Sequence, residues 1–277
     1  MMLSADRLRL GYGNHVVVKD ISVSIEYGTM NCIIGPNGCG KSTLLRGLSG
    51  LLAPLQGAIT LDDKPLNAWP ARQRAQRLAV LLQNPIAPDG ISVEQLVQHG
   101  RYPHQGIFQR PRAEDHEAVE WALAITGMHR YRRRPFHALS GGERQRGWIA
   151  LALAQQADVL LVDEPTTFLD IGRQLEIMDL LRQLNRDHGT TVVMVLHDIN
   201  QASRYADRLL AMQSGALIAD GAPVEVIHPE LLMQLFDLET ERVMRDEDGR
   251  AYPYCMPVRA QRTPHHHAST PRPVAPG

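Results

Sequence analysis

A glycine-rich stretch early in the chain has the composition and spacing of a phosphate-binding loop. It reads Gly35-Pro36-Asn37-Gly38-Cys39-Gly40-Lys41-Ser42-Thr43 and fits the pattern GxxxxGK[ST]. A strand-like apolar run (30–34) precedes it and a helical pattern (41–48) follows it, which disfavours the alternative of a turn with a chance lysine. Glycines let backbone N–H groups face phosphate oxygens, and the helix N-terminus adds partial positive charge. We therefore expect Lys41 to reach the β- and γ-phosphates of a nucleotide and the hydroxyl of Ser42 to bind Mg²⁺.

Two carboxylates follow a second apolar run. Residues 159–162 read as a buried strand, and Asp163 and Glu164 come directly after it. Open α/β sheets bind ligands at the carboxyl ends of their strands. Two acids at a strand end are usually only solvated charge, but beside a phosphate loop they have a use. We expect Asp163 to hold Mg²⁺, directly or through water, and Glu164 to polarise the attacking water as general base.

A third stretch combines a helix cap with two glycines. In Leu139-Ser140-Gly141-Gly142-Glu143-Arg144-Gln145-Arg146, Ser140 and Glu143 fit the S-x-x-E capping box of a helix that continues beyond residue 148. A capping box alone does not require Gly141 and Gly142. Glycines at a helix N-terminus remove side chains, so a phosphate can approach closely.

This stretch resembles the signature motif of ATP-binding-cassette (ABC) ATPases, and other family marks follow in the family's order over residues 3–257. Tyr12 is similar to the aromatic residue that stacks on adenine, and Gln83 to the glutamine that links the catalytic sheet to a helical subdomain. Asp170 ends a loop (166–170) similar to one that touches the opposite subunit, and His197 resembles the switch histidine near the γ-phosphate.

The resemblance implies ATP and Mg²⁺ as ligands and assigns the site residues. The implied catalytic residues are Glu164, His197 and Gln83, and the Mg²⁺ ligands are Ser42, Gln83 and Asp163. ATP contacts would come from Tyr12, the loop from Gly35 to Thr43, the segment from Ser140 to Glu143, and Asp170. The family also implies a head-to-tail homodimer, in which each ATP lies between the phosphate loop of one copy and the signature of the other.

A finer resemblance is to the ATPases of bacterial iron-siderophore importers, and within them to the ferric enterobactin (catecholate) type. The residues that carry it are 100–105, 144–150, 166–171 and 196–202, although these ATPases often have alanine where this chain has Gly147. The implied partners are membrane permease subunits and, indirectly, a periplasmic siderophore-binding protein. The implied location is peripheral, on the cytoplasmic face of the bacterial inner membrane. ATPases for vitamin B12, haem or hydroxamate siderophores look similar and remain alternatives.

Composition argues against other classes of function. The 277 residues carry a formal net charge of −1, which does not suit a nucleic-acid partner. A soluble ABC ATPase acting on DNA or ribosomes usually has two cassettes or a long coiled coil, and a P-loop kinase has no use for the signature. The three cysteines form no CxxC pair of the kind found in metal or redox sites. No run reaches the roughly 20 apolar residues of a membrane span. We interpret the three histidines at 265–267 as an adventitious metal-binding run.

The order of patterns predicts an α/β P-loop NTPase fold. Apolar strands alternating with helices after residue 138 indicate a mostly parallel sheet. Short strands near 8–10 and 21–25 indicate an antiparallel N-terminal part. Helical patterns at 93–99 and 114–126 indicate an inserted subdomain between residues 84 and 138. We expect one ABC ATPase domain over residues 1–257 and a disordered Pro/His-rich tail over residues 258–277.

Overall fold

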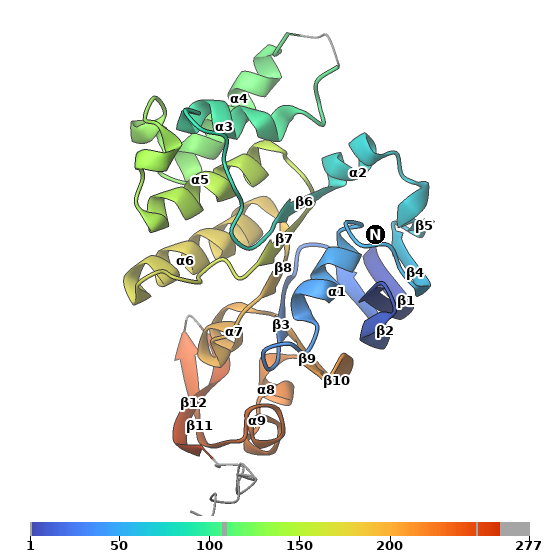
Figure 1. Cartoon of the computed structure of the whole chain (residues 1–277). Coiled ribbons are helices and arrows are strands. Elements are labelled where there is room, and N and C mark those ends of the chain that lie inside the picture. Colours follow the sequence, from blue (N-terminus) through green and yellow to red (C-terminus); the bar gives the residue numbers. More distant parts are fainter. Residues whose placement is uncertain (1, 107–109, 248, 261–277) are drawn as a thin grey trace, which may run out of the picture.

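The protein is described by a computed structural model over residues 2–106, 110–247 and 249–260. Within these residues a six-stranded sheet forms the centre, in the order β10-β9-β3-β8-β7-β6 (Figure 1). Its strands are β3 (Met30–Ile34), β6 (Leu78–Leu81), β7 (Val159–Asp163), β8 (Thr191–Val195), β9 (Arg208–Gln213) and β10 (Ala216–Gly221). All neighbours pair in parallel except β9 and β10, which form a hairpin. The predicted fold class, with its mostly parallel sheet, is confirmed.

The central strands β3, β7 and β8 are buried along their whole length and mostly apolar, because both faces of the sheet are covered. Along β8, Val192 and Met194 belong to one hydrophobic core and Val193 and Val195 to a second core. This alternation follows from the two-residue period of a strand. The first core contains the helices that cover one face, and the second contains α1 (Lys41–Leu48) with the antiparallel sheet.

The N-terminal sheet is antiparallel, as predicted, but its strands are longer than the sequence indicated. Its order is β2-β1-β4-β5. The bounds are β1 (Met2–Tyr12), β2 (His15–Glu26), β4 (Gln56–Leu61) and β5 (Lys64–Pro65). Exposed polar pairs inside the strands, Asp6 and Arg7 in β1 and Lys19 and Asp20 in β2, interrupt the apolar pattern, but the two strands still pair on either side of them.

Helices α3 (Val93–Gln98) and α4 (Ala113–Ile125) pack with α5 (Gly141–Ala154) to one side of the sheet, and α6 (Ile171–His188) shares their core (Figure 1). The sequence expected helices at 93–99 and 114–126, so both lie within one residue of the prediction. The other helices are α2 (Ala71–Arg77), α7 (Ile199–Tyr205), α8 (Pro223–Val226) and α9 (Pro229–Phe236), with 3₁₀ turns at 66–68, 99–101, 129–131 and 136–138.

The chain continues past α9 as a hairpin of β11 (Leu238–Glu247) and β12 (Arg250–Ala260), which corrects the predicted start of the tail. We expected disorder from residue 258, but 258–260 complete β12 because Arg259 and Ala260 pair with Glu239 and Leu238. The remainder of the predicted tail, residues 261–277 with the histidine run, lies outside the described residues. Among the described helices, none has the length and apolar character that a membrane crossing requires.

Candidate functional site

The phosphate loop joins β3 to α1 and depends on its glycines. Gly35, Gly38 and Gly40 have φ angles of 145°, 75° and 106°, which L side chains rarely adopt. A Cβ atom on Gly35 would lie 2.2 Å from the carbonyl oxygen of Met212. Lys41 is 5% exposed, and its Nζ atom donates to the carbonyl oxygens of residues 35 and 36, each at 2.9 Å. The ammonium group therefore lies within the loop that the sequence predicted.

The carboxyl ends of four parallel strands meet at one edge of the sheet. The phosphate loop follows β3, and Asp163 is the last residue of β7. His197 comes two residues after β8, and Gln83 comes two residues after β6. Because β3, β8, β7 and β6 are neighbours in that order, these segments must come together.

Ser42 and Asp163 form a direct contact across this edge. The hydroxyl of Ser42 donates to Oδ1 of Asp163 at 2.9 Å, and Asp163 is 3% exposed. Burial raises the pKa of Asp163, and the hydrogen bond from Ser42 opposes that rise. Mg²⁺ prefers oxygen ligands, and here a hydroxyl and a carboxylate lie side by side. The pair therefore fits this ion.

The carboxylate of Glu164 is held by three donors from three segments. His197 Nε2 lies 2.5 Å from Oε1, Gln83 Nε2 donates to Oε2 at 2.7 Å, and Thr167 Oγ1 donates to Oε2 at 2.9 Å. The side chain of Glu164 is 11% exposed, and its backbone turns sharply after β7 with a φ of 53°. A carboxylate fixed in this way can accept a proton from water.

Sequence reasoning missed Thr167 as a contact of Glu164. We had assigned its loop to the opposite subunit. The sequence signal that could have predicted this contact is a hydroxyl residue three positions after the expected base. Gln83 was expected on Mg²⁺, yet its amide nitrogen contacts Glu164 in the structure.

One cavity of about 490 Å³ contains Lys41, Ser42, Gln83, Glu164 and His197. Its full lining comprises Val17, Asn37, Gly38, Gly40, Lys41, Ser42, Thr43, Gln83, Glu164 and His197. Asp163 and Thr167 instead line an adjoining cavity, which Gln83 and Glu164 also line. Within the described part of the chain, the lining of the first cavity does not include Tyr12, Asp170 or the segment 140–143. Tyr12 is 48% exposed at the end of β1, and Arg46 Nη1 donates to its hydroxyl at 3.2 Å.

The signature segment forms the predicted capping box at the start of α5. The N–H of Glu143 donates to Ser140 Oγ at 3.4 Å, and the N–H of Ser140 donates to Glu143 Oε2 at 2.8 Å. A hydrogen bond from Tyr131, with that from the Ser140 N–H, lowers the pKa of Glu143 to about 2. Ser140 and Gly141 are exposed, so this helix end faces outward. Asp170 caps α6 by accepting from the N–H of Arg173 at 2.9 Å.

Known proteins with similar sequences are ATP-binding proteins, in agreement with the phosphate loop of this chain. The family model described as "ABC transporter" matches residues 18–167, more than half of the chain. The iron(3+)-hydroxamate import ATP-binding protein FhuC of Bacillus subtilis is 44% identical over 254 residues, which cover 92% of this chain and 94% of FhuC. The chain belongs to the ABC transporter family. It is an ATPase of that family, whose ATP hydrolysis is coupled to transport.

Other relatives of this ATPase also match over at least 80% of this chain. The ferric enterobactin transport ATP-binding protein FepC of Escherichia coli (strain K12) is 46% identical over 85% of this chain and 87% of its own. A solved structure described as an inward-facing, metal-chelate-type ABC transporter has a TM-score of 0.80 at 28% identity, over 93% of this chain and 97% of that one. The dimeric bacterial ABC transporter cassette MJ0796 has a TM-score of 0.71 at 27% identity, over 80% of this chain and 98% of its own.

Proposed function

We propose that this chain is the ATP-hydrolysing subunit that energises import of an iron(III)-siderophore complex through a separate membrane permease. The observation that carries the ATPase part is the single cavity that contains Lys41, Ser42, Glu164 and His197. The names of FepC and FhuC support the cargo class. The chain is 46% identical to FepC over 236 residues and 44% identical to FhuC over 254 residues, so both a catecholate and a hydroxamate are candidate cargoes. The finer resemblance of residues 100–105 and 196–202 is the reason for placing the catecholate first. The hemin import protein HmuV of Rhodococcus jostii is 38% identical.

In this proposal the loop N–H groups and Lys41 hold the phosphates of ATP, and Tyr12 stacks on adenine. Ser42 and Asp163 would hold Mg²⁺, together with the amide oxygen of Gln83, and the ion would supply positive charge to the phosphates. Glu164 takes a proton from water as the water oxygen attacks the γ-phosphorus. The bond from that phosphorus to the bridging oxygen breaks, and ADP leaves. His197 positions Glu164 and contacts the γ-phosphate.

The active enzyme in this proposal is a head-to-tail homodimer. Ser140, Gly141, Gly142 and Glu143 contact the γ-phosphate that a second copy holds, and Asp170 lies at the same interface. The support is that segment 140–143 is outside its own chain's phosphate cavity and that Ser140 is exposed. Moving an open–closed equilibrium from 1:99 to 99:1 requires about 5.5 kcal/mol of differential binding, which several charge-assisted contacts to ATP can supply.

The permease would dock near residues 83–105, with the subunit peripheral on the cytoplasmic face of the inner membrane and a periplasmic siderophore-binding protein delivering the cargo. The support is an exposed surface with apolar residues, where Ile86 is 92% and Tyr102 is 60% exposed. A neighbouring hollow is lined by Ile91 and Tyr102. A permease helix could bury part of this apolar surface.

Growth on single iron sources tests the proposal. A strain without this gene should lose growth on ferric enterobactin, keep growth on inorganic iron, and recover with the wild-type gene but not with Glu164→Gln. Loss of growth on a ferric hydroxamate alone would reassign the cargo. Unchanged growth on every chelate and on haem would reject iron import as the function.

A further inference from the structure

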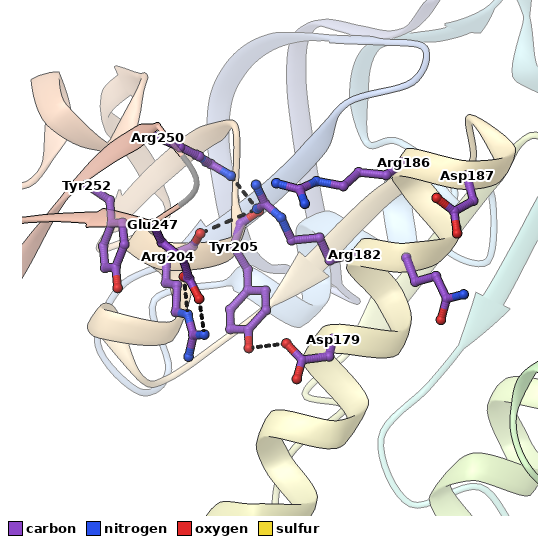
Figure 2. Close-up of a pocket in the computed structure, with 10 residues that line it drawn as sticks. Asp179, Arg182, Arg186, Asp187, Arg204, Tyr205, Glu247, Arg250 and Tyr252 are labelled. Atoms are coloured by element: carbon purple, nitrogen blue, oxygen red, sulfur yellow. Dashed lines mark hydrogen bonds and ion pairs between the residues drawn. The ribbon is translucent and has the colours of Figure 1, made fainter.

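Another polar cavity, of about 370 Å³, lies between α6, α7 and the C-terminal hairpin (Figure 2). Among the described residues, none lines both this cavity and the phosphate-loop cavity. Four arginines line it: Arg182 and Arg186 from α6, Arg204 from the end of α7, and Arg250 from β12. The ATPase mechanism uses none of them.

Three of these guanidinium groups converge. Figure 2 shows those of Arg182, Arg186 and Arg250 pointing toward one another. Arg182 Nη1 donates to the carbonyl oxygen of Tyr205 at 2.8 Å, and Arg250 Nη1 donates to the same oxygen at 3.5 Å. Burial lowers the pKa of Arg182, and the charges of Arg250 and Arg186 lower it further. Burial likewise lowers the pKa of Arg250. Like charges are therefore held close together at the carboxyl end of α7.

Three carboxylates around the cavity, those of Glu247, Asp179 and Asp207, already have partners. Glu247 forms a two-point ion pair with Arg204, at 2.7 and 2.5 Å, and Asp179 accepts from the hydroxyl of Tyr205 at 2.7 Å. Asp207 accepts from the N–H of Met30 at 2.8 Å and lies 3.5 Å from Arg250.

The positive charge that remains is centred on Arg186. Across the described residues, Arg186 has no direct hydrogen-bond or ion-pair partner, and Arg182 donates only to main-chain carbonyls. Asp187, next to Arg186 on α6, lies apart from the three guanidinium groups in Figure 2. The cavity lining thus contains four arginines and three carboxylates, and one of the arginines, Arg186, is unpaired among the described residues.

We propose that Arg182, Arg186 and Arg250 bind the phosphate group of a small molecule or lipid headgroup. The planar fork of arginine matches the spacing of phosphate oxygens, and the two or three unesterified oxygens of a phosphate group can accept from more than one fork. Such a ligand would join the carboxyl ends of α6 and α7 to the hairpin. It would also offset the repulsion among the partly buried guanidinium groups of Arg182 and Arg250 and the exposed one of Arg186.

Calorimetric titration with inorganic phosphate in chloride buffer tests this site. Because phosphate also fits the glycine-rich loop, every protein in the series carries Lys41→Ala. Adding Arg186→Gln should weaken phosphate binding about tenfold or more, since a hydrogen bond to a charged group is lost. Arg186→Lys should retain part of the affinity. The matched control is Arg133→Gln, an exposed arginine far along the chain from the cavity, which should change nothing.

Arg186→Gln should leave the fold intact because the side chain has no hydrogen-bond or ion-pair partner in the described part of the chain, and a melting curve verifies this. Sedimentation with phosphatidylglycerol or phosphatidylcholine vesicles separates the two sources of phosphate. Saturable phosphate binding that depends on Arg186 supports a soluble ligand. Binding that depends on Arg186 and appears only with phosphatidylglycerol vesicles supports a headgroup. The proposal is overturned if neither binding is seen, or if binding is unaffected by Arg186→Gln.

Discussion

The Nε2 atom of His197 lies 2.5 Å from Oε1 of Glu164, which joins the residues that follow two neighbouring parallel strands. The other carboxylate oxygen accepts from Gln83, after β6, and from Thr167, in the loop before α6. Three segments of the chain therefore determine where Glu164 points. A shift of any one of them changes the orientation of the carboxylate in the cavity.

Glu164→Gln should separate ATP binding from hydrolysis. Glutamine keeps the shape of the side chain but cannot take a proton from water, so phosphate release should fall about 10²- to 10⁴-fold. ATP affinity, measured by equilibrium dialysis, should remain within a few-fold of wild type. Thr167→Val is the matched control because it removes one donor and keeps the carboxylate. It should lose much less activity than Glu164→Gln.

The same variant tests the head-to-tail dimer. With hydrolysis blocked, ATP should keep Ser140 and Gly142 of one copy bound to the phosphate loop of the other. We expect Glu164→Gln to elute from a sizing column as a dimer with ATP and as a monomer without it. A monomer under both conditions would rule out ATP-dependent pairing of the isolated subunit.

Lys41→Ala should weaken ATP binding about 10- to 100-fold, because a charged donor to phosphate contributes about 1.5–3 kcal/mol. The Nζ atom is already aimed at the inside of the loop by its two carbonyl contacts. Binding of a fluorescent ATP analogue measures the loss. Lys64→Ala, which removes a lysine over the ring of Trp69, is the control and should leave affinity unchanged. Equal affinities for the two variants would reject the role given to Lys41.

Asp163→Asn should stabilise the fold at neutral pH while abolishing Mg²⁺-dependent hydrolysis. Burial raises the pKa of Asp163 in the folded state, so ionisation favours the unfolded chain. This loss of folding stability is absent below about pH 3.9, the pKa of aspartate in the unfolded chain. It develops as the pH rises through the higher pKa that Asp163 has in the folded state. The melting temperature of the variant should therefore exceed that of wild type at pH 7, and the difference should shrink toward pH 4. A lower melting temperature at pH 7 would show that the contact with Ser42 outweighs burial.

The parts of the site that sequence predicted best are local in the chain. The phosphate loop needs only consecutive residues and their flanking pattern, and the same holds for the pair Asp163 and Glu164. Gln83 and His197 were assigned through the family resemblance alone, because only the sheet order brings them to Glu164. Their direct contacts with its carboxylate required the structure.

Elements with exposed polar residues were the ones that sequence reasoning missed. Strand β11 reads LETERVMRDE, and its only fully buried side chain is that of Thr240, so no apolar alternation marks it. The helix α2 buries no residue, and β6 after it is only four residues long. Backbone pairing and neighbouring segments form these elements, and neither is visible in a hydrophobic pattern.

Gly147→Ala should destabilise the protein, although alanine is the better helix former. A Cβ atom at Gly147 would lie 2.6 Å from Cε2 of Phe136, whose ring also packs edge-on against Trp148. Helix propensity favours alanine by about 1 kcal/mol, and overpacking a core costs about 1–3 kcal/mol. We expect a net loss of up to about 2 kcal/mol in urea unfolding. Gly147→Ala should lower the free energy of unfolding less in a Phe136→Leu background than in the wild-type protein. A single variant more stable than wild type would show that the ring of Phe136 moves aside at little cost.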